Sequence, residues 1–390
     1  MRGIALLGIC LANYPEFALY SFLKREVVEA MPTAGIDGIV RFFQYFLVDG
    51  KFYTLFSLLF GVGFSILMSN YSQKGENGLR LFYRRIVLLI LIGLGHLLFL
   101  WAGDILILYA LLGLFLPLFR KMSDKKLLIC ALALWFIPVL VDTLIVLFGW
   151  NLSAPAIKAT AYFHNRTGIT EENFPVWLVD AKSYMDVLHF NIAGSFIRLQ
   201  EFIEGNRAFK VMGLFLFGLY IGRNRLYAKL GENKILLKKV CLYGFLSGVP
   251  ASLLYAWNAV SHYPLGLTGS AVVYAVSVIP MSLGYITLVC LWYLRDTDKK
   301  FFKAMAAPGR MALTNYIMQS VFGMIIFYGI GFALGAKLGL VYVELVALGV
   351  FFFQVLYSNV WLHYLRYGPL EWIWRMLTYG KILSLKKENV

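Results

Sequence analysis

The sequence predicts an all-α membrane protein, a bundle of helices that crosses the bilayer about ten times. Hydrophobic residues make up 60% of the 390 residues and charged residues only 15%, whereas soluble domains keep about 25% of their residues charged. Apolar stretches of about twenty residues recur along the chain, and each can cross a hydrocarbon core of ~30 Å as a helix. Lipid offers the backbone no hydrogen bonds, so spans are helices or closed barrels. Continuous apolar runs such as residues 86–100 lack the alternation of barrel strands.

The apolar runs place the expected spans. Pro15 is expected to break or end the membrane part of the first one. The expected spans are residues 3–22, 46–69, 84–101, 103–120, 127–149, 207–223, 236–258, 269–294, 310–334 and 341–364.

Positive charge gathers in alternate loops. Lys and Arg cluster in loops that begin near Lys74, Arg120, Arg223 and Arg295, while the short loops between them carry almost none. Cytoplasmic loops of membrane proteins are rich in Lys and Arg, so both chain ends are expected in the cytoplasm. This loop pattern also accounts for the formal net charge of +15, and we expect no nucleic-acid partner.

Four segments follow from this topology. Residues 1–149 and 207–364 are expected to form two five-helix membrane halves. Residues 150–206 mix aromatic and charged residues and are expected to lie outside, as helices over the outer mouth. Residues 365–390 include a Trp-rich stretch, which favours a helix at the cytoplasmic interface.

Several common kinds of site are absent from the sequence. The four cysteines, Cys10, Cys130, Cys241 and Cys290, lie in apolar stretches without ligand spacing and are interpreted as packing residues. We find no metal-binding histidine pattern, phosphate-binding loop, dinucleotide fingerprint or nucleophile elbow. We therefore expect no metal and no permanently bound cofactor.

Two small-xxx-small patterns predict close helix contacts. Gly218 and Gly222 form one pattern, and Gly331 and Gly335 form the other. Small residues at this spacing let two membrane helices approach closely.

His96 and Asp104 are the leading candidates for chemistry. At 1.5 Å per residue, His96 lies about 7–8 Å below the turn at Trp101, and Asp104 lies about 4–5 Å below it on the next helix. A hydrogen bond between them would fix the imidazole tautomer and raise its basicity, as a general base requires. A structural interhelical hydrogen bond is the alternative.

Other polar residues share the outer depth of the predicted bundle. They can line a cavity open to the outer face, or their charged groups can simply reach the headgroups. These residues are Asn13, Glu16, Asp49, Lys51, Lys210 and Glu344.

A second polar set lies in the inner half of the last two spans. We interpret it mainly as hydrogen bonding between helices, with a ligand path as the alternative. The set comprises Asn315, Tyr316, Gln319, Gln354, Ser358 and Asn359.

Five sequence motifs resemble the YeiB-like bacterial membrane proteins, also called domain of unknown function four-eighteen. They are RGIALLGI at 2–9 with Asn13, GKFYTLFSLLFG at 50–61, Arg84 and Arg85 with His96 and WAGDILILYA at 101–110, GRMALTNY at 309–316, and GPLEWIWR at 368–375. The resemblance spans essentially the whole chain. The Leu-Asp-x-Leu that usually precedes the first motif is absent, so we expect that the natural start lies upstream.

The family is distantly similar to transmembrane acyltransferases, including the acyltransferase-three group and the lysosomal heparan acetyltransferase. The resemblance implies a multi-pass protein of the bacterial inner membrane that passes acyl groups from a cytoplasmic thioester to a sugar or lipid acceptor outside. In the heparan enzyme the catalytic histidine precedes the second helix. Residues 36–50 of this chain contain no histidine, so His96 would take that role.

The leading hypothesis is therefore acyl transfer, with His96 as base oriented by Asp104. Arg84 and Arg85 would meet an anionic donor such as acyl-CoA. A transporter or exporter of a small solute, or a non-catalytic membrane partner protein, remains the alternative. The substrate-binding candidates are Asn13, Asp49, Lys51, Arg84, Arg85, Trp101, Tyr109 and Asn315.

Overall fold

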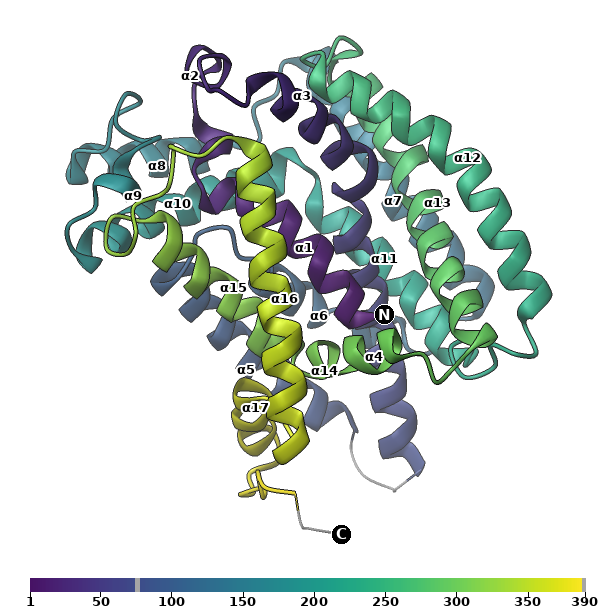
Figure 1. The fold of residues 1–390 in the computed structure, drawn as a ribbon. Helices are drawn as coiled ribbons and strands as arrows, with labels where there is room; N and C mark the ends of the chain where they lie inside the picture. Colours follow the sequence, from purple (N-terminus) through teal and green to yellow (C-terminus); the bar gives the residue numbers. More distant parts are fainter. Residues whose placement is uncertain (74–77, 388–390) are drawn as a thin grey trace.

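The structure is a computed structural model that describes residues 1–73 and 78–387. Over those ranges the chain is helical and contains no β-strand (Figure 1). Lys74, one of the predicted loop charges, lies outside the described residues. The helices are α1 (Arg2–Phe17), η1 (Tyr20–Phe22), α2 (Arg25–Glu29), α3 (Ala34–Phe43), η2 (Gln44–Val48), α4 (Lys51–Gln73), α5 (Gly78–Phe99), α6 (Leu106–Gly113), η3 (Leu116–Phe119), α7 (Asp124–Phe148), α8 (Ala154–Thr167), α9 (Trp177–Asp180), α10 (Tyr184–Glu204), α11 (Arg207–Arg223), α12 (Lys234–Val260), α13 (Gly266–Arg295), α14 (Lys300–Arg310), α15 (Ala312–Phe327), α16 (Leu340–Tyr364) and α17 (Pro369–Tyr379).

Within residues 1–73 and 78–387, six helical segments are long and apolar enough to cross a membrane. Each coincides with one of the expected spans, so the prediction of a multi-pass, all-α membrane protein is confirmed at this level. The segments are Ala34–Tyr71, Gly78–Phe99, Asp124–Phe148, Lys234–Val260, Gly266–Arg295 and Leu340–Tyr364. The other four expected spans contain shorter helices, and their crossing stays a prediction.

The expected continuous helix over residues 103–120 is wrong. The chain is irregular from Trp101 to Ile105, and α6 has only 8 residues before the 3-10 turn η3. Asp104 Oδ1 accepts a hydrogen bond from the Ile107 backbone N–H at 2.8 Å, which satisfies a free donor at the start of α6. Pro117 has no backbone N–H and prevents a continuous α-helix at the other end.

Two other expected spans are also shorter in the structure. α1 ends at Phe17, two residues after Pro15, and α15 ends at Phe327. Gly331 and Gly335 consequently lie in the turns after α15, so the second small-xxx-small pattern is not a helix contact.

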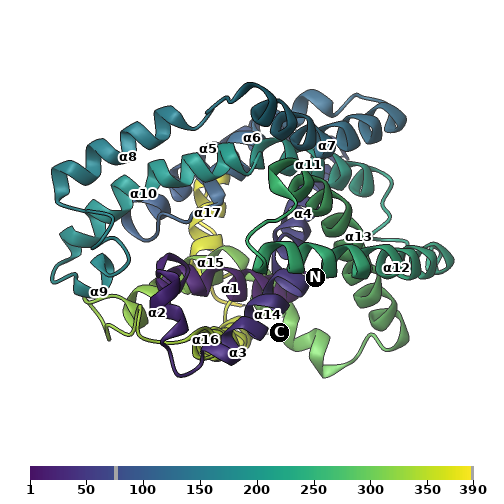
Figure 2. The ribbon, with the colours of Figure 1, turned by 90° about the horizontal axis from the view of Figure 1, so that it is seen from above.

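Helices from the two expected membrane halves pack against each other. α1 contacts α14, α15 and α16, and α4 contacts α11 and α13. Figure 1 shows α1 in the middle of the molecule, behind α16. α12 and α13 form an antiparallel pair on the opposite side from α8, α9 and α10 (Figure 2).

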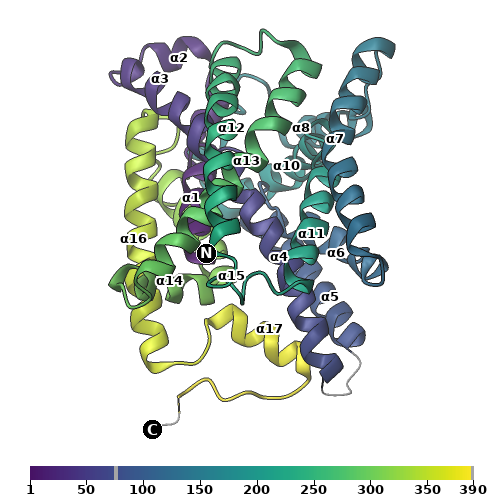
Figure 3. The ribbon, with the colours of Figure 1, turned by 90° about the vertical axis from the view of Figure 1, so that its right-hand side faces the viewer.

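Helices α10 and α17 complete the bundle. α10, from the expected outer segment, packs against α5, α8 and α11. α17 packs against α5 and α15, and Figure 3 shows it at one end of the molecule, with α2 and α3 at the other. The helix expected in the Trp-rich tail is therefore present, and it begins at Pro369 after Gly368.

Helices α4 and α11 pack with their backbones in close contact. A Cβ at Gly218 would lie 2.1 Å from the Leu58 carbonyl oxygen, and one at Gly61 would lie 2.1 Å from the Phe215 carbonyl oxygen. Side chains larger than hydrogen therefore do not fit, which confirms the close contact expected from Gly218 and Gly222.

We predict that Gly218→Ala lowers the thermal unfolding midpoint in detergent by several degrees, because α4 and α11 must move apart. Gly349→Ala in α16 is the matched control, since a Cβ there meets no atom within 4 Å. Equal midpoints for the two variants would contradict this packing.

Candidate functional site

Three buried polar side chains meet between α5, α6 and α15. His96 Nδ1 lies 2.7 Å from Asp104 Oδ2, and His96 Nε2 lies 2.7 Å from Ser320 Oγ. The exposed fractions of His96, Asp104 and Ser320 are 2%, 0% and 1%. Both imidazole nitrogens are therefore hydrogen-bonded away from solvent. We call these three residues the His96 triad.

The partners of His96 determine where its proton lies. A carboxylate only accepts hydrogen bonds, so Nδ1 carries the proton and donates it to Asp104. Nε2 then holds a lone pair and accepts the hydroxyl proton of Ser320. This is the tautomer in which a histidine can act as a general base.

The irregular segment from Trp101 to Ile105 is held from several sides. Arg198 of α10 donates from Nε to the Asp104 carbonyl oxygen at 3.0 Å and from Nη2 to the Gly103 carbonyl oxygen. A Cβ at Gly103 would lie 2.1 Å from the Trp101 ring, so only glycine lets this indole fold back over the segment. The Trp101 ring also packs against Phe17, at 4.2 Å between ring centroids.

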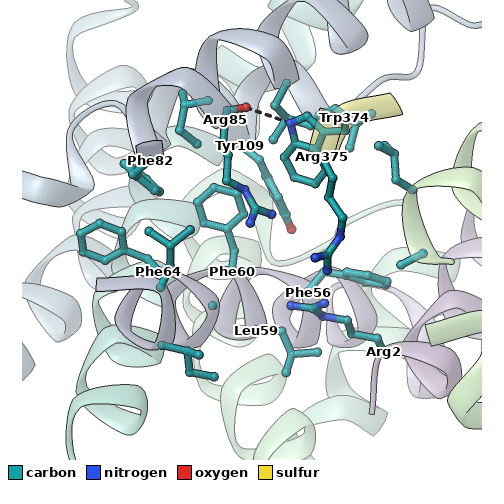
Figure 4. Close-up of a pocket in the computed structure, with 18 of the residues that line it drawn as sticks. Arg2, Phe56, Leu59, Phe60, Phe64, Phe82, Arg85, Tyr109, Trp374 and Arg375 are labelled. Carbon is teal, nitrogen blue, oxygen red and sulfur yellow. Dashed lines mark hydrogen bonds between the residues drawn. The ribbon is translucent and has the colours of Figure 1, made fainter. Parts of the chain in front are cut away.

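A cavity of about 600 Å³ lies among α1, α4, α5, α6, α15 and α17. Most of its wall is apolar, but Arg2, Arg85 and Arg375 direct their guanidinium groups into it (Figure 4). Its wall also includes Ile105 and Tyr316, which lie beside the His96 triad. Arg85 and His96 lie eleven residues apart on α5, or about 16 Å along its axis.

The three cavity arginines lack a carboxylate at salt-bridge distance within the described residues. None takes part in a salt bridge among residues 1–73 and 78–387. The Arg85 guanidinium lies over the Trp374 ring, at 4.5 Å from its centroid. Glu371 lines an adjoining cavity together with Arg2 and Arg375. Its carboxylate accepts hydrogen bonds from the backbone N–H groups of Leu313 and Thr314 and so caps α15.

A second, much smaller cavity lies beside Trp101, Ala102 and Gly103 of the irregular segment. Its volume is about 40 Å³, roughly enough for a water molecule. Glu16, Trp101, Gly103 and Arg198 are among its lining residues, and it shares none with the large cavity.

On α5 and on α15, a triad residue lies between the positions that line the two cavities. α1 also lines both, with Ile9 in the large cavity and Glu16 in the small one, and carries no triad residue. On α5, Leu89 lines the large cavity, His96 follows, and Trp101 beyond the helix end lines the small one. On α15, Tyr316 lines the large cavity, Ser320 follows, and Tyr328 lines the small one. None of the three triad residues lines either cavity; all three are buried among the chain segments that form the two walls.

The outer polar set does not gather in one cavity. Of its six members, only Glu16 lines one of the three cavities found in the described part of the chain. Asp49 accepts the Tyr255 hydroxyl, and fully buried Lys51 donates to the Tyr45 carbonyl oxygen at 2.7 Å. Glu344 accepts Gln44 Nε2 at 2.6 Å.

The predicted substrate-binding residues fall into two groups. Arg85 and Tyr109 line the large cavity and Trp101 lines the small one. The remaining five, Asn13, Asp49, Lys51, Arg84 and Asn315, line none of the three cavities.

Four of the six members of the inner polar set make the expected bonds between helices α15 and α16, whereas Tyr316 lines the large cavity. Asn315 Nδ2 donates to Ser358 Oγ at 2.9 Å, and Gln354 Nε2 donates to the Asn315 carbonyl oxygen at 2.8 Å. Gln319 Nε2 donates to Gln354 Oε1 at 3.1 Å. These bonds join α15 to α16.

Four residues of the site were missed from the sequence. Arg2 and Arg375 belong to motifs that carry the family resemblance, which was the available signal for them. Ser320 is 224 residues from His96, and nothing in the local sequence links the two. Arg198 was one charge among several in the outer segment.

We predict that an anion with several phosphate groups, such as tripolyphosphate, raises the thermal unfolding midpoint of the detergent-solubilised protein, because binding stabilises the folded state. Arg85→Ala should lose most of this increase. Arg84→Ala is the matched control, since it removes the same charge one residue earlier, outside the cavity. Equal increases in both variants would show that phosphate binds elsewhere.

Comparison with known proteins identifies the relatives of this chain. Residues 221–381 match the family model described as protein of unknown function (DUF418). The chain is 29% identical to the uncharacterized protein YxaH of Bacillus subtilis, over 97% of this chain and 92% of that protein. It is 28% identical to the uncharacterized 39.9 kDa protein in the amylase 3' region of Bacillus acidopullulyticus, over 100% and 95%.

The uncharacterized protein YeiB of Escherichia coli is 26% identical, over 97% of this chain and 94% of that protein. No solved structure matches the chain. These matches support a YeiB-like family for this chain, to whose members it is similar over nearly its whole length.

Proposed function

We propose that this protein is a membrane enzyme that moves acyl groups across the bilayer. It takes the group from a cytoplasmic thioester such as acyl-CoA and delivers it to a hydroxyl of a sugar or lipid acceptor on the other side. The observation that carries the proposal is the buried His96 triad next to Ile105 and Tyr316, which line the cavity that holds the three arginines.

The proposed topology is ten spans in the bacterial inner membrane, with both chain ends in the cytoplasm. Arg2 near the N-terminus, Arg85 in the first turns of α5 and Arg375 of α17 line one cavity. Their meeting supports placing the N-terminus, the loop before α5 and the C-terminal helix on the same side. The basic loops support calling that side cytoplasmic.

The large cavity is the proposed donor site. Guanidinium groups bind phosphates through charge and paired N–H donors, so Arg2, Arg85 and Arg375 suit the phosphates of CoA. The apolar wall suits a less polar arm and acyl group. About 16 Å of helix separates Arg85 from His96, which requires an extended donor.

His96 is the proposed general base. Its Nε2 takes a proton from the hydroxyl that attacks the acyl carbon, and the Asp104 carboxylate stabilises the imidazolium that forms. Arg198 supports this role, because its bonds to the carbonyl oxygens of Gly103 and Asp104 fix the backbone that carries the carboxylate.

We predict that His96→Ala lowers thiol release from acyl-CoA by about 10²–10⁴-fold. Asp104→Asn should also lower it, because an amide does not stabilise the imidazolium. The measurement is thiol release by the purified protein in vesicles supplied with a bacterial membrane extract as acceptor.

His363→Ala is the control, because His363 lies near the end of α16 and lines none of the three cavities. Full activity of His96→Ala would reject His96 as the base. Absence of thiol release by the wild-type protein with short- and long-chain acyl-CoA, together with movement of an intact solute, would favour a transporter instead.

A further inference from the structure

The Ser320 hydroxyl does not make the local hydrogen bond that many serines and threonines in these helices make. Thr54, Ser57 and Thr378 each donate to the carbonyl oxygen four residues earlier, at 2.6–2.9 Å, which is the usual local bond for a helical hydroxyl. Ser320, in contrast, is bonded across the bundle to His96 Nε2 at 2.7 Å. Within the described residues its hydroxyl has no other partner.

The bonding order of the three residues is that of a nucleophile, a base and an orienting carboxylate. Ser320 donates to Nε2, and Nδ1 donates to Asp104. A serine becomes a useful nucleophile when an adjacent base takes its proton while a third group orients that base. The same arrangement recurs on unrelated folds, so geometry rather than sequence order identifies it.

We propose that Ser320 is a catalytic nucleophile that carries the acyl group as an ester between the donor and the acceptor. This inference rests on the proposed acyl-transfer function and adds a covalent intermediate to it. An ester on Ser320 is useful because it lets the donor leave before the acceptor binds, so the two substrates need not meet.

In the first step, Ser320 Oγ attacks the thioester carbonyl carbon and passes its proton to His96 Nε2. A carbon–oxygen bond forms, the carbon–sulfur bond breaks, and the imidazolium gives the proton to the leaving thiolate. The products are a free thiol and the Ser320 ester.

In the second step, the acceptor hydroxyl passes its proton to Nε2 and attacks the ester carbon. The bond from that carbon to Ser320 Oγ breaks, and the proton returns to Oγ. No oxidant, reductant or further reactant takes part.

Tyr316 controls access to Ser320 from the donor side. It lies one helical turn before Ser320 on α15, lines the large cavity, and packs its ring 5.1 Å from the His96 ring, centroid to centroid. Its hydroxyl is held only by a long bond from the Ile105 backbone N–H, at 3.4 Å. The donor carbonyl reaches Ser320 when this side chain turns aside.

The test is to incubate the full-length protein in vesicles with acetyl-CoA but no acceptor, then digest it and measure peptide masses. We expect one acetyl group on the peptide that contains Ser320 in the wild-type protein. The acetyl group should be missing in Ser320→Ala and in His96→Ala. Ser320→Cys, which keeps a nucleophile, should carry the acetyl group as a thioester that hydroxylamine removes.

The transfer rate separates the inference from the function on which it rests. We expect Ser320→Ala to lose more than about 10³-fold in thiol release with acceptor present, as removal of a triad serine does elsewhere. Ser277→Ala is the control, because its buried hydroxyl bonds only to the Tyr274 carbonyl oxygen. Thermal unfolding midpoints of all variants verify that they are folded.

Two results would overturn the inference. If Ser320→Ala keeps wild-type thiol release while His96→Ala loses it, the acyl group passes directly to the acceptor, and only the proposed function stands. If the wild-type protein transfers acyl groups but never carries one on Ser320, the ester is likewise rejected. If the wild-type protein neither releases thiol nor becomes acylated, the proposed function itself fails.

Discussion

The rest of the site depends on the Asp104 carboxylate. Its Oδ2 accepts a hydrogen bond from His96 Nδ1–H, and its Oδ1 accepts one from the backbone N–H of Ile107 at the start of α6. The same residue's carbonyl oxygen accepts Arg198 of α10. A carboxylate buried at 0% exposure is stable only when its oxygens are bonded in this way. The break between α5 and α6 is therefore part of the site, because a continuous helix would leave the Ile107 N–H bonded within the backbone.

The two cavities differ in size and in the residues that line them. The large one is apolar with three arginines, and it fits an extended anionic molecule. The small one holds Glu16 and Arg198 beside Trp101 and has room only for a small group. His96 lines neither cavity and bonds through Nε2 to Ser320 of α15. In the proposed function, the large cavity takes the donor.

α17 contributes to the donor side although it follows all the expected spans. Glu371 caps α15 through the backbone N–H groups of Leu313 and Thr314 and through the Thr314 hydroxyl at 2.6 Å. Trp374 donates to the Arg85 carbonyl oxygen at 3.2 Å and lies under the Arg85 guanidinium. α17 therefore holds two parts of the site in place: α15, which carries Ser320, and Arg85 of α5.

The sequence by itself determined the membrane class, because six apolar runs of sufficient length are a local property of the chain. The sequence also predicted that His96 and Asp104 lie close to each other, because only 8 residues and one turn separate them and the helical rise sets their depths. Only the tertiary structure decided that Ser320, 224 residues away, is the second partner of His96, and that Arg2 and Arg375 face the same cavity as Arg85. Those positions depend on how α1, α15 and α17 pack around α5, and side-chain packing between distant segments leaves no period or spacing in the sequence.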